Sequence, residues 1–240
     1  MFAILKRDWL RSAPLRWAGL FAFEFAVVLL GVLAAQSLQE RFAARQDRAS
    51  FTQTRSALDE QVQTVGSAMI MKGLQARCVR SNLETIVAAM EAEEPLPEET
   101  FTTHPPKGAI DLSIWNGDLA ARARTYAEPE AVYAYEFMAA VSDGLVASAQ
   151  NEEAWWATLG MADAANLPQD RRTHVLLAAR NLLHAYEGWE RAPAALDAMM
   201  TQLGVDPQWE WIGRMHGAEV PCAREVRSGI SALGKEAKTD

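Results

Sequence analysis

The sequence is poor in the residues and motifs that carry chemistry. It has two cysteines and four histidines among 240 residues. It contains no G-x-S-x-G segment, no glycine-rich phosphate loop and no S-x-x-K segment, which are signatures of nucleophilic and phosphoryl-transfer enzymes. No histidine has a partner at the spacing of a zinc or catalytic motif; the four are His104, His174, His184 and His216. We therefore expect a protein without catalytic activity, metal site or cofactor.

An excess of positive charge is also absent beyond the N-terminal segment, where acidic residues outnumber basic ones. Residues 1–39 carry a formal net charge of +2, whereas the rest of the chain carries −10. An acidic domain without a basic stripe repels phosphate backbones and anionic lipid headgroups. We therefore expect no nucleic-acid binding.

Only one long hydrophobic run is present, at residues 17–38. It reads WAGLFAFEFAVVLLGVLAAQSL, and as a helix it is long enough to cross a hydrocarbon core of about 30 Å. Its single charge, Glu24, costs about 3 kcal/mol on insertion, but the Leu, Phe and Val side chains each return about 0.3 to 0.6 kcal/mol. The run predicts a transmembrane helix. A signal peptide cleaved after Ala34 is the alternative, although a signal core usually has only about 7 to 15 apolar residues.

A basic cluster precedes this helix, formed by Lys6, Arg7, Arg11 and Arg16. The positive-inside rule keeps such a cluster in the cytoplasm. Arginines just beyond the far end of the helix reduce the asymmetry; they are Arg41, Arg45 and Arg48. The sequence therefore predicts a cytoplasmic segment at 1–16, a transmembrane helix at 17–38 and an exported domain at 39–240.

The two cysteines, Cys78 and Cys222, lie in the segment predicted to be exported. In an oxidising compartment an isolated pair of cysteines is a disulfide candidate. Two separate buried thiols are the alternative.

Apolar residues recur at helical spacing after the membrane segment, and no strand-like alternation occurs. Long helices are expected at about 38–69, 74–94, 129–162 and 168–204. Gly66 and Gly73 are expected to bend or interrupt the first pair, and Pro193 to divide the last helix. Four such helices with mostly short connections predict an all-α fold, in which the transmembrane helix continues into an antiparallel bundle.

The segments between these helices have their own signals. Residues 95–110 hold four prolines and predict a loop longer than most in compact domains. A short helix is expected from about Ser113. Another is expected to begin at Asp206 and Pro207, a typical cap and first helical position, and to be followed by a polar tail after Cys222.

Tryptophans form a possible aromatic surface, made of Trp155, Trp189, Trp209 and Trp211. Tryptophan combines apolar area with a polar N–H, which suits contact with a sugar, a peptide or a partner protein. The alternative is packing in the core and at helix ends. Trp156 and Tyr186 lie on apolar stripes and are expected to face inward.

Residues 24–35, EFAVVLLGVLAA, resemble the corresponding segment of an uncharacterised group of bacterial single-span membrane proteins. That segment has an acidic residue, a Val-rich run and a Gly-Val-Leu-Ala sequence near the N-terminus. The placement of Cys78, Trp115 and Cys222 is also similar. The resemblance implies an inner-membrane location with an exported, periplasmic helical region, and it carries no activity with it.

The polar group and the small residues of the membrane segment share one helix face, formed by Glu24, Val28, Gly31 and Ala35. A Gly-x-x-x-Ala pair lets another backbone approach closely, and the carboxyl gains a hydrogen-bond partner on association. We therefore expect an accessory subunit of a membrane assembly that binds a protein partner or a second copy through this helix. The alternative is a tethered, exported module that binds or senses a ligand of unknown identity.

Overall fold

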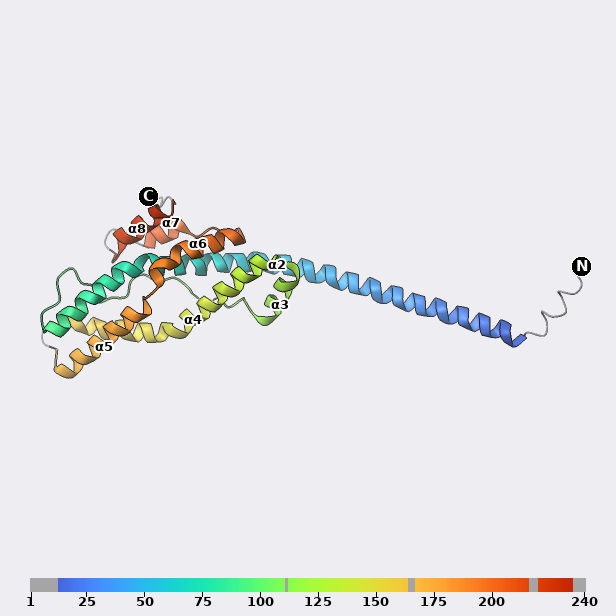
Figure 1. Ribbon diagram of the computed structural model, residues 1–240, viewed down its shortest axis with the longest axis horizontal. Helices are drawn as coiled ribbons and strands as arrows, with labels where there is room; N and C mark the ends of the chain where they lie inside the picture. The colour runs from blue at the N-terminus through green and yellow to red at the C-terminus, as the bar shows by residue number, and fades with distance from the viewer. Residues whose placement is uncertain (1–12, 111, 164–166, 216–219, 235–240) are drawn as a thin grey trace, which may run out of the picture. The chain divides into compact units, whose positions relative to one another are not determined.

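The computed structural model describes residues 13–110, 112–163, 167–215 and 220–234, with side chains from residue 19 onward except that of Asp163. All regular structure in these residues is helical (Figure 1), which confirms the all-α fold class. The chain forms two compact units, residues 1–52 and 53–240. Lys6, Arg7, Arg11 and His216 lie outside the part that the structure describes, as do the side chains of Arg16 and Trp17.

One helix, α2, extends from Ala13 to Ala92 without a break. The interruption expected near Gly66 and Gly73 does not occur, and the reason is packing. A Cβ atom on Gly66 would lie 2.4 Å from the Met200 sulfur, and one on Gly73 would lie 2.7 Å from the ring of Pro193. The two glycines therefore let the segment with Pro193 and Met200 approach α2 closely. The two helices predicted at 38–69 and 74–94 are one continuous helix.

Three further helices complete the bundle: α4 (Pro129–Leu159), α5 (Gln169–Ala185) and α6 (Ala192–Leu203). Short 3-10 turns, η1 (Gly160–Asp163) and η2 (Trp189–Arg191), precede α5 and α6. The break between α5 and α6 falls at Gly188, whose φ of 82° is left-handed. Pro193 lies in the first turn of α6, where its missing N–H costs no helical hydrogen bond.

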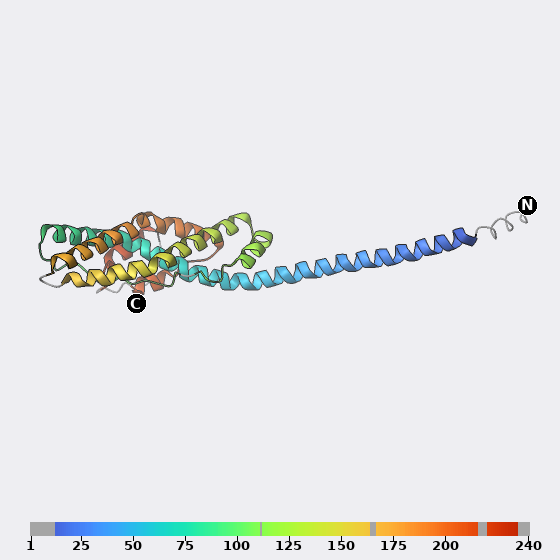
Figure 2. The ribbon, with the colours of Figure 1, turned by 90° about the horizontal axis from the view of Figure 1, so that it is seen from below.

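The bundle contains both parallel and antiparallel neighbours (Figures 1 and 2). Near the start of α4 the Tyr135 hydroxyl donates to Asp59, and near its end Glu152 pairs with Lys72, so α2 and α4 run in the same direction. Helices α5 and α6 return in the opposite direction. The parallel pair is possible because the segment between Ala92 and α3 carries the chain back along the bundle.

That returning segment, described at residues 93–110 and 112–116, is held by amide side chains of α2. Irregular backbone next to a core needs hydrogen-bond partners, and side chains on the adjacent helix provide them. The contacts are Asn82 with both backbone groups of Phe101 (2.8 and 2.9 Å), Gln75 with the carbonyl of Pro106 (2.8 Å) and Gln61 with the N–H of Ile114 (3.0 Å). Positions 61, 75 and 82 are multiples of seven residues apart, so they lie on one face of the helix.

The shorter helices differ more from expectation. Helix α3 is Gly117–Tyr126 and begins after Asn116, whose side chain accepts from the N–H of Leu119 at 3.1 Å. Helix α7 is Trp209–Met215, two residues later than predicted from Pro207.

The prediction of a polar tail after Cys222 is wrong, because helix α8 follows it at Ala223–Ala232. This helix buries Ala223, Val226 and Ile230, which are three and four residues apart, and exposes charged residues between them. The helical spacing was present in the sequence, but it extends over less than three turns.

Cys222 directly precedes α8, at its N-cap position, and lies beside Cys78 of α2. Their Cα atoms are 5.6 Å apart, within the range for a disulfide bond. The two cysteines are 144 residues apart in the sequence, so a bond between them closes most of the second unit into one covalent loop.

We expect this bond to be formed in the native protein. In the chain-entropy model a loop of this length stabilises the fold by up to about 5 kcal/mol, so reduction should lower the thermal unfolding midpoint of the full chain. The Cys78→Ser/Cys222→Ser variant is the control, because its midpoint should not respond to reductant. Labelling of both thiols in unreduced, freshly purified protein would show that no bond exists.

Candidate functional site

The first candidate surface is the apolar part of α2. Every residue from 19 to 49 is exposed, including the large apolar side chains between Leu20 and Leu38. This part of the helix is long and apolar enough to cross a membrane, judged by length and composition. So much exposed apolar surface is costly in water and requires lipid or another protein around it.

The face predicted to bind a partner lies within this exposed segment. Glu24, Val28, Gly31 and Ala35 are all exposed. A Cβ atom added to Gly31 would have no heavy atom within 4 Å. The space beside Gly31 is therefore open for another helix.

The four tryptophans of the predicted aromatic surface are each half-buried. Trp155 and Trp189 pack against a core cluster, and Trp211 lies against Gly108, where an added Cβ would come within 2.6 Å of the indole ring. Trp156 and Tyr186 are buried. These tryptophan contacts are of the kind expected if the tryptophans pack in the core and at helix ends, which was the alternative to an aromatic binding surface.

Sequence reasoning missed a buried ion pair in the second unit. The Lys72 ammonium donates to both carboxylate oxygens of Glu152, at 2.7 and 2.8 Å. The two side chains are only 15% and 8% exposed. A third group, the Nε2 atom of His104, lies 3.5 Å from the same carboxylate. This contact joins His104 to a distant helix, so the prediction that no histidine has a partner at the spacing of a zinc or catalytic motif did not address it.

Two aromatic residues complete the surroundings of the pair. The Tyr186 hydroxyl is hydrogen-bonded to Glu152. The Lys72 nitrogen lies 4.3 Å from the centre of the Tyr186 ring and 5.9 Å from that of Trp189, within the range of cation–π attraction. We call Lys72, His104, Glu152 and Tyr186 the buried cluster. It joins α2, the returning segment, α4 and the end of α5.

The pKa values of the cluster show how burial and pairing compete. Burial raises the pKa of Glu152, but the hydrogen bond from His104 and the adjacent Lys72 ammonium outweigh it, and the pKa falls to about 2. Burial lowers the pKa of Lys72, and the attraction of Glu152 restores it only in part. Burial and the nearby carboxylate raise the pKa of Tyr186, which stays a hydrogen-bond donor. The surroundings thus favour the ionised form of Glu152, whereas burial makes the charged form of Lys72 less favourable.

A cavity of about 270 Å³ lies beside the buried cluster. Its walls come from α2, α4, Tyr186 and residues 104–110 of the returning segment. Most of the lining is apolar, and it includes the small residues Ala68 and Ala149. An apolar cavity with a few convergent polar groups is the usual form of a small-molecule site.

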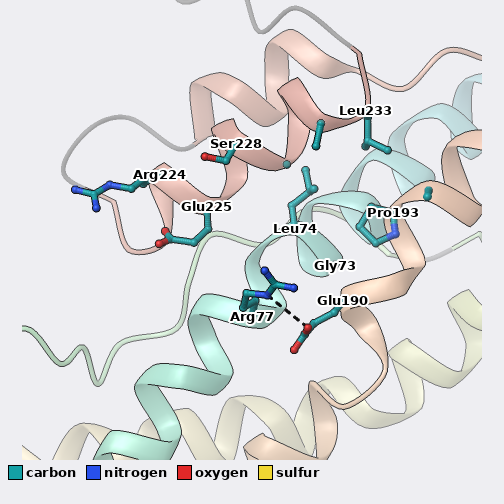
Figure 3. A pocket seen from close by; sticks show the side chains of 12 residues that line it. Gly73, Leu74, Arg77, Glu190, Pro193, Arg224, Glu225, Ser228 and Leu233 are labelled. Atoms are coloured by element: carbon teal, nitrogen blue, oxygen red, sulfur yellow. Dashed lines mark ion pairs between the residues drawn. The ribbon is translucent and has the colours of Figure 1, made fainter.

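A second hollow, of about 470 Å³, lies between α2, α6 and α8 (Figure 3). Arg77 and Glu190 point toward each other across it, with 3.6 Å between nitrogen and oxygen. Most of the Arg77 side chain is exposed, so solvent screens this pair. This pair therefore differs from the Lys72–Glu152 pair beside the first cavity, whose side chains are buried.

The chain has no match among protein-family models, curated proteins or solved structures. The resemblance of residues 24–35 to a group of bacterial membrane proteins therefore stays a prediction.

The shifted pKa of Glu152 predicts a specific acid dependence of stability. Because the pKa in the folded state lies below the ordinary value of 4.5, the carboxylate stabilises the fold above about pH 4.5, and this contribution is lost as the pH falls toward 2. A shift of this size corresponds to about 3 kcal/mol. The difference in free energy of unfolding between wild type and Glu152→Gln should therefore shrink between pH 5 and pH 2, as followed by chemical denaturation.

The adjacent residue provides a matched control. Glu153 is exposed and pairs with Lys107 at the surface, so Glu153→Gln should change stability little at any pH in this range. A difference for Glu152→Gln that stays constant from pH 5 to pH 2 would contradict the assignment.

Proposed function

We propose that the protein is a single-span membrane protein that serves as an accessory subunit of a membrane assembly. The observation that carries this proposal is the exposed apolar segment of α2, which no residue that the structure describes covers. Lipid covers such a helix, and the face with Glu24, Gly31 and Ala35 offers a second helix both a polar group and close approach.

The orientation that we propose places residues 1–16 in the cytoplasm and the bundle in the bacterial periplasm. The basic cluster before the helix supports it through the positive-inside rule. The distance between Cys78 and Cys222 also supports it, because structural disulfides persist in oxidising compartments. The exported bundle would then contact partners outside the cytoplasm.

A second candidate function is ligand binding or sensing by the exported bundle. The cavity beside the buried cluster favours it, because an apolar space with charged groups at one end suits a small molecule. Copurification from mild detergent distinguishes the two functions: a stable set of membrane proteins supports the first, and a bound small molecule on an otherwise isolated chain supports the second.

The membrane interaction can be tested with substitutions that leave the bundle unchanged. Glu24→Leu removes the polar group, and Gly31→Leu fills the space that another helix would occupy. Each should insert normally and weaken association. Interhelical hydrogen bonds in membranes contribute about 0.6 to 2 kcal/mol, so we expect a loss of about 3-fold to 30-fold for Glu24→Leu, measured by crosslinking in native membranes.

Two controls lie on the same helix. Gly19→Leu adds the same side chain at a glycine that also has open space around it, on another face. Leu30→Ala alters a neighbouring apolar position. Both should leave crosslinking near the wild-type level. If Glu24→Leu and Gly31→Leu also leave every crosslinked species unchanged, the interaction function loses its support.

A further inference from the structure

We infer that the cavity beside the buried cluster binds small, uncharged aromatic molecules and rejects anions. This inference rests on the ligand-binding function proposed above as the second candidate. It follows from the size of the cavity, the character of its walls and the way in which its charged groups are already paired.

The volume limits the ligand to a compact molecule. An apolar cavity of about 150 Å³ holds benzene, so a cavity of about 270 Å³ has room for about ten non-hydrogen atoms. This is the size of two fused rings. Lys107 lines the cavity and its side chain is 55% exposed, so the cavity reaches solvent at that side.

The walls favour an aromatic ring. Leu145 and Ile110 provide apolar contact, and Ala68 and Ala149 present flat surface with little side chain. Met71 also lines the cavity. Thioether sulfur makes favourable contacts with aromatic rings and adapts to their shape.

The charged groups in the walls already have partners. The Glu152 carboxylate contacts Lys72, His104 and the Tyr186 hydroxyl. The Lys107 ammonium forms an ion pair with Glu153. An anionic ligand would lose its hydration and find no unpaired cation in return. The two lysines therefore do not make this an anion site, and an uncharged ligand fits best.

The test compares three probes that share the naphthalene ring system and differ in charge. They are 2-naphthol, which is neutral at pH 7, 2-naphthoate, which is anionic, and 2-naphthylmethylammonium, which is cationic. Equilibrium dialysis against the full chain in lipid nanodiscs measures their binding. We expect saturable binding of 2-naphthol to one site, at least tenfold tighter than that of either charged probe.

Substitutions locate the binding and separate it from partitioning into lipid. Ala149→Phe fills the cavity and should weaken 2-naphthol binding at least tenfold, whereas Ala147→Phe, at an exposed position of the same helix, should not. Ala149→Val serves as a milder substitution if the larger side chain prevents folding. Glu152→Gln removes the counter-ion of Lys72 and should reverse the preference in favour of 2-naphthoate.

The outcomes distinguish the ligand class from the ligand-binding function. If 2-naphthoate binds wild type as tightly as 2-naphthol and Ala149→Phe abolishes both, the cavity binds ligands but the inference about charge is overturned. If no probe shows saturable binding that Ala149→Phe removes, the ligand-binding function and this inference both fail.

Discussion

The buried carboxylate of Glu152 is the constraint on which the arrangement of the second unit depends. A charge removed from water must collect hydrogen-bond donors, and this one collects them from α2, from the returning segment and from the end of α5. Each donor fixes the position of a different element relative to α4. The cavity beside the cluster is lined by all four members of the cluster, together with small and apolar residues.

Helix α2 contributes to both parts of the molecule with different surfaces. Its first half exposes apolar side chains on all sides, as expected of a helix surrounded by lipid. In its second half, amide side chains on one face bind the returning segment. The second half also carries Lys72, which pairs with Glu152. The helix is continuous from Ala13 to Ala92, so the apolar segment and Lys72 belong to the same helix.

The sequence predicted those features that depend on local pattern. Hydropathy located the apolar helix, Pro129 marked the start of α4, and the apolar stripes identified Trp156 and Tyr186 as buried. The continuity of α2 was missed because glycine was taken as a helix breaker, whereas Gly66 provides room for packing.

The buried cluster was missed because its members are far apart in the chain, Lys72 and Glu152 by 80 residues. A signal did exist, since Glu152 lies on the stripe with Leu145 and Trp156, where a charge requires a partner. No local sequence pattern identifies that partner.

A double-mutant cycle on the Lys72–Glu152 pair tests its central role most directly. Lys72→Met alone and Glu152→Leu alone should each lower the free energy of unfolding by about 3 to 5 kcal/mol, and the double variant should recover most of that loss. Losses that are small, or that add in the double variant, would contradict the account.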